Sequence, residues 1–183
     1  MRLFFTARIP YFHRVLLVES GSRYLLESLL PGVYSYHPEI QRVDVVTCFP
    51  GSPANFDPER GEILRIHEFR GREGRKRLYK LMKERGYDIC GIICSGEAVM
   101  TKWKWAIAAK APSKVFILNE NGDYFYLDHS QLTTIRKFAM FRAGLTGAGA
   151  VATLGRLVVF PFSLAYLLAF AGWVHMRRKV RAS

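Results

Sequence analysis

Cysteine is scarce in this sequence, with three among 183 residues and none of them in a CxxC pair. This scarcity argues against a disulfide-stabilised scaffold and against a zinc ribbon. GxGxxG and GxxxxGK[ST] motifs are also missing, so neither dinucleotide binding nor P-loop chemistry is predicted. The five histidines are scattered along the chain and give no local metal cluster. We therefore expect neither a cofactor nor a metal ion.

Acidic residues are missing from the last part of the chain. All 15 Asp and Glu residues precede Arg142, whereas residues 142–183 hold six of the 27 Lys and Arg residues. Half of all residues are hydrophobic and 14% are aromatic, which excludes a disordered chain. The change in composition near Arg142 predicts a soluble domain followed by a membrane segment.

The predicted membrane segment contains an uncharged run of 20 residues, Leu157–Met176. As a helix it spans roughly 30 Å, which matches the hydrocarbon core of a bilayer. Trp173 and the basic residues 177–181 suit a helix end at the lipid headgroups. A buried soluble helix rarely runs so far without a charge. Two shorter apolar pieces, 145–155 and 157–174, are compatible with a re-entrant hairpin instead.

The beginning of the chain, MRLFFTARIPYFHR, has too short an apolar run for a cleavable signal peptide. We therefore expect the globular part to be cytoplasmic and the protein to be bound to the membrane. Basic residues flank the apolar segment on both sides, so its topology stays open. The expected divisions are an amphipathic segment at 1–13, a lobe at 14–142, the membrane segment at 143–176 and a basic tail at 177–183.

Short apolar runs alternate with helical patterns between residues 14 and 142. Continuous apolar runs suit strands that are buried on both faces of a parallel sheet. The alternation predicts an α/β fold with a Rossmann-like, mostly parallel sheet and flanking helices. We expect strands at 15–18, 43–49, 62–69, 89–94 and 115–118, a return strand at 124–127, and helices at 23–36 (broken late by Pro31 and Gly32), 71–86, 98–111 and 131–142.

Ligands of such sheets gather at the carboxyl ends of the strands. Two loops with small residues occur there, and each is expected to open a helix whose backbone N–H groups attract anions. The serines and acids also suit ordinary helix caps, so both interpretations stay open. The predicted ligand-binding residues are Ser20, Gly21, Ser22, Arg23, Ser95, Gly96, Lys102, Asn119, Glu120 and Asp123, with Glu19 and Glu97 as weak candidates for catalysis.

Asn119–Asp123 concentrates acids and amides, but the spacing is not that of a calcium loop. The Asn-Gly pair favours a hairpin turn over a metal site. A basic belt along residues 70–85 is compatible with nucleic acid or with a solvated helix face. Beside a membrane segment it favours anionic lipid, and nucleic acid is not the expected partner.

The order of elements resembles the N-terminal, acceptor-binding lobe of family 9 glycosyltransferases, which are lipopolysaccharide heptosyltransferase-like enzymes. The resemblance covers residues 14–128 and is carried by RVLLVESGSRYLLESLLPGV, VDVVTCFPG, GREGRKRLYKLMKERGYDICGIICSGE and APSKVFILNENGDYFYLD. It implies an acceptor site in this lobe and a nucleotide-sugar site in a second lobe. In the family, an Asp in the loop after the first strand acts as the general base. Here Arg23 stands near that place, and the donor lobe is missing.

The resemblance implies a membrane-attached, glycosyltransferase-like acceptor lobe that acts with a separate donor-lobe protein. A sugar or lipid-linked acceptor is the expected ligand, in the assembly of cell-surface glycans or lipid-linked sugars. The alternative is a non-enzymatic membrane scaffold or protein-interaction module. A nucleotide-binding regulator is the third hypothesis. Whether the chain turns over any substrate is not fixed by its sequence.

Overall fold

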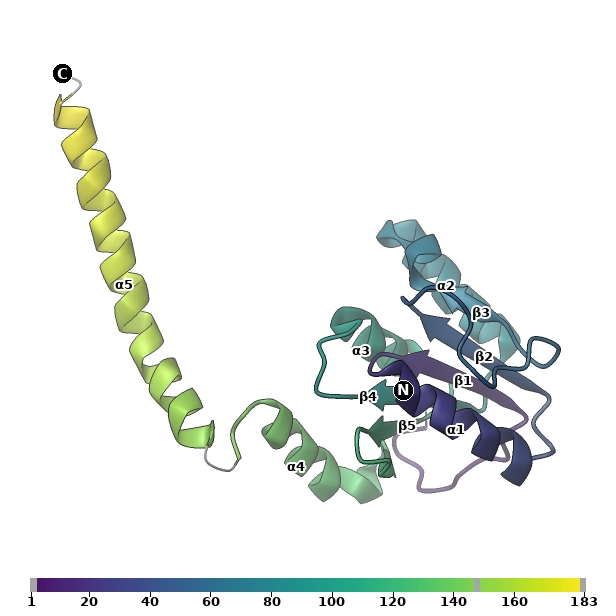
Figure 1. Ribbon diagram of the computed structural model, residues 1–183. Helices are drawn as coiled ribbons and strands as arrows, with labels where there is room; N and C mark the ends of the chain where they lie inside the picture. The colour runs from purple at the N-terminus through teal and green to yellow at the C-terminus, as the bar shows by residue number, and fades with distance from the viewer. Residues whose placement is uncertain (1–2, 147–148, 182–183) are drawn as a thin grey trace. The chain divides into compact units, whose positions relative to one another are not determined.

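The computed structural model describes residues 3–146 and 149–181 of the chain (Figure 1). The chain divides into two compact units, Met1–Leu132 and Thr133–Ser183. The first unit contains the whole sheet and its flanking helices, and the second contains the apolar C-terminal helix. All of the cavities and polar networks discussed below belong to the first unit.

The first unit is built on a six-stranded sheet in the order β3-β2-β1-β4-β5-β6. Every neighbouring pair is parallel except β5 and β6, which form an antiparallel hairpin. The predicted α/β class with a mostly parallel sheet is therefore confirmed. The strands are β1 (Arg14–Glu19), β2 (Arg42–Thr47), β3 (Ile63–Arg65), β4 (Ile89–Cys94), β5 (Lys114–Asn119) and β6 (Tyr124–Tyr126).

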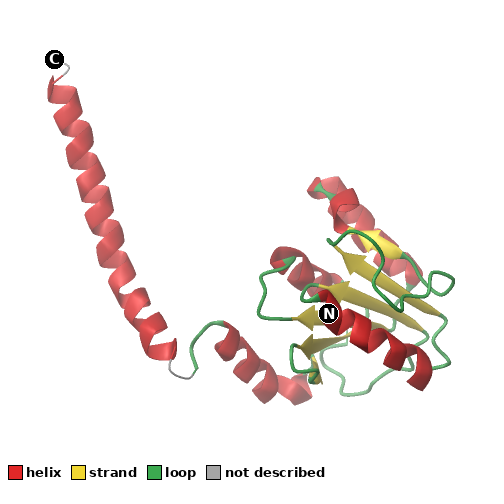
Figure 2. Cartoon of the chain, in the orientation of Figure 1, coloured by secondary structure: helices red, strands yellow, loops and turns green. Residues whose placement is uncertain are grey.

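Helices cover both faces of this sheet (Figure 2). Helix α1 (Arg23–Tyr36) lies on one face, and α2 (Gly71–Arg85) and α3 (Thr101–Lys110) lie on the other (Figure 1). Connections between parallel strands are right-handed, so their direction across the sheet decides which face the connecting helix covers. The chain moves across the sheet in one direction from β1 to β2 and in the opposite direction from β3 to β4 and β5, so α1 lies on one face and α2 and α3 lie on the other. Apolar residues on alternate positions of the strands pack against both helix layers, so β1 and β4 at the centre are almost entirely buried.

Helix α1 continues through Pro31, contrary to the expected break at Pro31 and Gly32. Proline has no N–H group to donate to the carbonyl of Glu27, four residues earlier. The side-chain amide of Asn55 donates to that carbonyl instead, at 3.4 Å. The helix is thus maintained by a loop that is distant in sequence.

The strand expected at 62–69 is also shorter than predicted. Only Ile63–Arg65 pairs with β2, and Ile66–Phe69 forms a 3-10 helix. Ile66 and Phe69 are both buried. Residues three apart share one face of a 3-10 helix, whereas in a strand they point to opposite faces. The turn therefore places both side chains on one side of the chain, where both are buried.

The N-terminal segment is attached to the sheet by a buried lysine. Lys114 is fully buried, and its Nζ lies 2.6 Å from Oδ2 of Asp128. The same ammonium group donates to the carbonyl oxygens of Leu3 and Thr6. Asp128 also caps the short 3-10 helix His129–Gln131. These contacts hold the described part of 1–13 against the first unit, as a turn at residues 3–5 followed by chain that is neither helix nor strand.

The second unit contains α5 (Gly149–Arg181) and, apart from its first residue, α4 (Leu132–Arg142). Within α5, Val158–Arg177 is the one described segment that is long and apolar enough to cross a membrane, with a mean hydropathy of 1.6. None of this segment is buried within the protein. Helix α5 runs without interruption through 33 residues, so it forms one helix rather than the two pieces of a re-entrant hairpin.

Candidate functional site

From β1 the chain adds β2 and β3 on one side of the sheet, and it then returns to add β4, β5 and β6 on the other side of β1. The strand order thus reverses between the neighbouring strands β1 and β4. The loops that follow these two strands lie in direct contact. Ser20 Oγ donates to the carbonyl of Ile93 at 2.7 Å. A Cβ atom on Gly21 would lie 2.8 Å from Ser95 Oγ and 2.9 Å from Ser95 N. Glycine is required at this position because the two loops approach closely, and the predicted site residues Ser20, Gly21 and Ser95 are thereby brought together.

Glu19 ends β1 with its side chain fully buried. Its carboxylate accepts from Arg23 Nε at 2.8 Å, and the hydrogen bond to Glu19 raises the pKa of Arg23. Arg23 Nη1 donates to the carbonyl of Pro50 at 2.8 Å, and its guanidinium lies 5.3 Å from the ring centre of Phe49. The ion pair engages Glu19 inside the protein, so this carboxylate is not presented to a substrate as a general base.

The loop after β4 differs from the prediction. Helix α3 begins at Thr101, six residues after Ser95, and Met100 before it has a left-handed φ of 48°. Ser95, Gly96 and Glu97 therefore do not form a helix N-terminus, and the helix start predicted there is wrong. Glu97 is exposed, and its amide donates to Ser95 Oγ at 3.4 Å. The predicted residue Lys102 lies exposed in the first turn of α3.

The segment Asn119–Asp123 forms the tight turn of the β5–β6 hairpin, as the Asn-Gly pair predicted. Asn119 Oδ1 accepts from the backbone N–H groups of Asn121 and Asp123, and Asn119 Nδ2 donates to the Asp123 carboxylate at 3.2 Å. Gly122 has a φ of 81°, which favours glycine. The side chains of Asn119 and Asp123 thus stabilise the turn, and Glu120 lies exposed beside them.

The three predicted segments lie at the same edge of the sheet. Val18 is in register with Ile92, and Cys94 is in register with Asn119. Because neighbouring strands are about 4.8 Å apart, the ends of β1, β4 and β5 lie within about 10 Å of each other. The space next to Gly96 is open, and a Cβ atom added there would meet no atom within 4 Å. The edge thus combines backbone groups, small side chains and free space.

A polar network at the opposite, amino-terminal edge was not predicted from the sequence. Asp44 in β2 is fully buried and accepts from Arg42 Nε at 2.8 Å and from Arg85 Nη1 at 2.6 Å. Tyr87 also donates to Asp44, and both arginines contact Glu62. Burial raises the pKa of Asp44, but the hydrogen bonds from Arg42, Tyr87 and Arg85 outweigh it and lower the pKa overall. One sequence signal was an acid within the apolar run VDVV.

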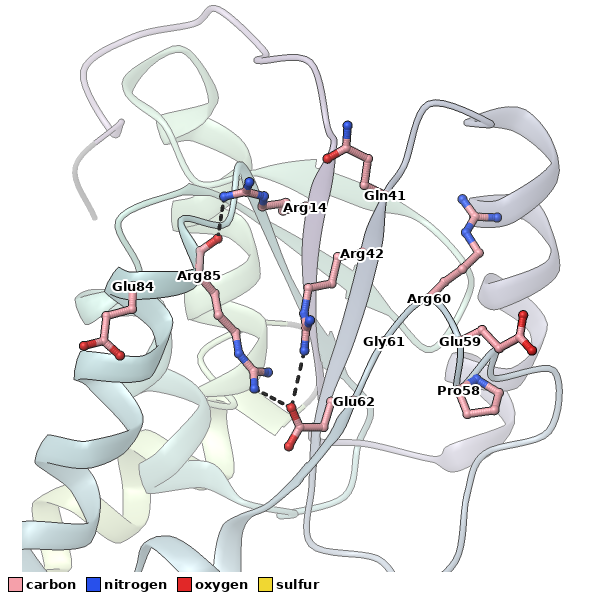
Figure 3. Close-up of a pocket in the computed structure, with 10 residues that line it drawn as sticks. All are labelled: Arg14, Gln41, Arg42, Pro58, Glu59, Arg60, Gly61, Glu62, Glu84 and Arg85. Carbon is pink, nitrogen blue, oxygen red and sulfur yellow. Dashed lines mark hydrogen bonds and ion pairs between the residues drawn. The ribbon is translucent and has the colours of Figure 1, made fainter.

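Three members of this network, Arg42, Arg85 and Glu62, line a cavity of about 580 Å³ (Figure 3). Its lining includes four arginines, which come from the starts of β1 and β2, the loop before β3 and the end of α2. A second cavity, of about 480 Å³, lies between α1 and the β5–β6 hairpin and is mainly apolar. Its lining includes Phe12, Leu29, Val33, Phe116, Tyr124 and Tyr126.

Gly91 explains how the aromatic wall of the apolar cavity is accommodated. A Cβ atom at Gly91 would lie 2.5 Å from the ring of Phe116 and 2.9 Å from Leu17. The ring of Phe116 lies across β4 in the space that a larger residue would occupy. In the described part of the chain, no three His, Cys, Asp or Glu residues come together as a possible metal site.

Comparisons with protein-family models, with curated proteins and with solved structures found no match to this chain.

Proposed function

We propose that this protein is a membrane-attached, glycosyltransferase-like acceptor lobe with a Rossmann-like fold. It binds a sugar-containing, lipid-linked acceptor at the carboxyl ends of β1 and β4 and acts with a separate chain that carries the donor site. The observation that carries this proposal is the contact of the Gly21 loop with Ser95 at the change of strand order. Ligands of open parallel sheets bind at such a point.

The groups at this edge suit a hydroxyl-rich ligand. Ser22 precedes α1 without capping it through its side chain, so its hydroxyl is available to a ligand. Glu97 is exposed beside the open space at Gly96. Hydroxyl and carboxylate oxygens accept hydrogen bonds from sugar hydroxyl groups. The predicted residues Ser22, Gly96 and Glu97 form the proposed contact surface, and Ser20 and Ser95 are buried beneath it, where they hold the two loops together.

The same edge supports a lobe that does not catalyse transfer alone. Glycosyl transfer requires a positioned base and a donor pocket. The Glu19 carboxylate is buried in its pair with Arg23, and among the described residues only helices follow β6. We expect the purified chain to transfer no sugar from any nucleotide-sugar. Turnover that is abolished by Glu19→Gln or Glu97→Gln would contradict this expectation.

Two features support a lipid-linked acceptor. Helix α5 includes a segment that is long and apolar enough to span a bilayer. The cavity between α1 and the β5–β6 hairpin has a mainly apolar lining, and its volume of about 480 Å³ is within the usual range for small-molecule sites. Tyr36 and Tyr124 at this cavity are largely exposed, and tyrosine suits a boundary between apolar and aqueous surroundings.

The acceptor site can be tested with the full chain in neutral lipid nanodiscs that contain a lipid-linked monosaccharide. Amide chemical shifts of Ser20–Ser22 and Ser95–Glu97 are expected to change on adding the acceptor lipid. A Cβ atom at Gly96 would meet no atom within 4 Å, so Gly96→Phe is expected to place its ring over the site, to abolish the shifts and to leave the unfolding temperature unchanged. Arg72→Phe, at an exposed position of α2, is the matched control. If no amide at this edge responds, the acceptor proposal is wrong.

The scaffold hypothesis is favoured by a different observation. Arg23, Asn119 and Asp123 make hydrogen bonds within the protein rather than pointing unpaired into a pocket. A scaffold would bind only protein through this edge. Co-purification with a donor-lobe chain, followed by transfer activity of the pair but of neither chain alone, distinguishes the acceptor lobe from a scaffold.

A further inference from the structure

The excess positive charge of residues 1–141 is concentrated in one stretch of the chain. Residues 1–65 hold seven arginines and seven acids, and residues 111–141 hold three basic and three acidic residues. Residues 66–110 hold eleven Lys and Arg residues and five acids. This stretch includes α2 and α3, which cover the same face of the sheet (Figure 1). The helix layer on that face therefore carries the excess positive charge.

Helix α2 arranges its basic residues along its outer side. Four exposed cations and one half-buried tyrosine follow each other at helical spacing and form what we call the basic row: Arg72, Arg75, Lys76, Tyr79 and Lys83. The buried residues Gly74, Leu78 and Met82 lie on the other side of the helix. The two acids of α2, Glu73 and Glu84, each follow a member of the row by one residue, which is about 100° around the helix. The basic row itself is therefore free of acids.

The acids of α2 do not neutralise the whole basic row. Glu73 pairs with Lys76 at 2.8 Å, and Glu84 pairs with Lys80 at 3.6 Å. Both pairs are largely exposed, and such surface pairs are weak. The cations of the row that make no ion pair among the described residues are Arg72, Arg75 and Lys83. Their charge is available to a partner outside the chain.

Helix α3 adds an exposed tryptophan and two exposed lysines to the same face. Lys102 and Trp105 are three residues apart on the outer side of the helix, and Lys110 ends it. The ring of Trp105 remains 41% exposed, and the buried Lys104 ammonium group lies 5.9 Å from its centre. An ammonium group at this distance attracts the ring and favours its position. Tryptophan beside exposed lysines is typical of surfaces at the level of lipid headgroups.

Anionic lipid is the partner that matches this face. Lysine and arginine near a membrane surface attract anionic headgroups. Within α5, Val158–Arg177 is long and apolar enough to cross a bilayer. A chain anchored through this segment keeps its first unit near the headgroups, so the basic face meets lipid at a high effective concentration. Nucleic acid offers similar phosphate charge, but an anchored chain does not hold it at such a concentration.

We propose that the outer side of α2 and α3 is a second membrane contact, which binds anionic lipid headgroups through the basic row and places Trp105 among them. The contact is electrostatic, so it forms on anionic membranes, is absent on neutral ones and is weakened by salt. It gives the first unit a docked position that the lipid composition controls. The proposal rests on the membrane attachment proposed above and not on the acceptor site.

The test places the isotopically labelled full chain in nanodiscs in which a few headgroups carry a gadolinium chelate, which broadens nearby amide signals. In nanodiscs rich in phosphatidylglycerol, the amides of α2 and α3 are expected to broaden. Those of α1, on the opposite face of the sheet, are expected to stay sharp. In nanodiscs of phosphatidylcholine alone, or at roughly 1 M salt, the broadening of α2 and α3 is expected to be lost because charges are screened within about 3 Å.

Three variants separate the position of the charges from their number. Arg72→Gln/Arg75→Gln/Lys83→Gln is expected to lower the ratio of docked to undocked protein about 100-fold, at about fivefold for each cation. Arg72→Glu/Glu73→Arg/Lys83→Glu/Glu84→Lys keeps the net charge but moves both acids into the basic row, and it is expected to undock the first unit as well. Arg72→Lys/Arg75→Lys/Lys83→Arg keeps every charge in place and is the matched control. Thermal unfolding checks that each variant is folded.

Co-elution of the chain with nanodiscs of either lipid reports on attachment through α5 separately. A chain that does not co-elute contradicts that attachment, and the same amides are then followed on adding soluble dihexanoyl phosphatidylglycerol. Shifts confined to α2 and α3 would then support the lipid contact, and their absence would overturn it. In nanodiscs, equal broadening of α1 and α2, or no effect of exchanging acids and cations, would also overturn it. A response of α2 and α3 to a DNA duplex but not to anionic lipid would assign the face to nucleic acid instead.

Discussion

The buried carboxylate of Glu19 and the guanidinium of Arg23 are joined 2.8 Å apart at the carboxyl end of β1. The Arg23 side chain is 27% exposed, whereas the Glu19 side chain is fully buried. The pair therefore connects the centre of the sheet to the first turn of α1 and to the loop at Pro50. Glu19 was a weak candidate for catalysis in the sequence. Its burial and its ion pair with Arg23 mean that the charge of its carboxylate is neutralised within the protein.

Arg23→Gln is expected to destabilise the protein by about 3 kcal/mol, because it leaves the Glu19 carboxylate buried without a cationic partner. Urea unfolding of the full chain in detergent measures this change. The double variant Glu19→Gln/Arg23→Gln removes both charges and is expected to recover much of the loss. Equal stability of Arg23→Gln and the unmodified protein would show that the pair contributes nothing.

Gly91→Ala is expected to destabilise the first unit by about 1–3 kcal/mol, because the added methyl group overlaps the ring of Phe116 and Leu17. Gly96→Ala is the matched control, since it introduces the same methyl group into open space. Thermal unfolding followed by circular dichroism compares the two variants. A Gly91→Ala variant as stable as Gly96→Ala would mean that Phe116 moves aside without cost.

The Asp44 network is expected to make stability sensitive to acid. The pKa of Asp44 is lower in the folded protein than its usual value, so the folded state favours the ionised form. This contribution is fully present above the unfolded pKa of about 3.9 and is lost as pH falls through the lower folded value. Unfolding free energies measured from pH 7 to pH 2 are expected to be flat above about pH 5 and to fall below about pH 4.

Asp44→Asn tests the origin of this acid sensitivity. The variant removes the ionisable group but keeps a similar shape, and it leaves Arg42 and Arg85 with Glu62 alone. It is expected to be less stable than the unmodified protein at pH 7 and to show a shallower loss of stability below about pH 4. Identical pH profiles for the two proteins would assign the acid sensitivity to other carboxylates.

The full chain is expected to sediment with membranes, and a chain that ends at Arg142 is expected to remain in the soluble fraction. The reason is the exposed apolar segment Val158–Arg177 in α5. Leu168→Arg places a charge within that segment and is expected to weaken membrane retention by disfavouring insertion. Arg156→Lys keeps the charge pattern and serves as its control. A full chain that stays soluble without detergent contradicts a membrane-spanning α5.

Local sequence patterns were sufficient to predict much of the fold. The apolar runs at β1, β2, β4 and β5 are buried strands, because each run is too short and too continuous for an exposed helix. The Asn-Gly pair gave the β5–β6 turn, since glycine adopts the left-handed conformation there. The 20-residue uncharged run gave the apolar part of α5 by its length alone.

Sequence alone determined these elements because their signals lie within a few residues of each other. Only the tertiary structure decided how polar groups are paired. Asp44 and Arg85 are 41 residues apart, and their contact depends on α2 ending beside the start of β2. The same holds for Asn55, which completes α1 at Pro31 from a distant loop, and for the cavity lined by Arg14 and Arg60. Long-range pairing follows from chain crossovers and side-chain packing, which no local periodicity specifies.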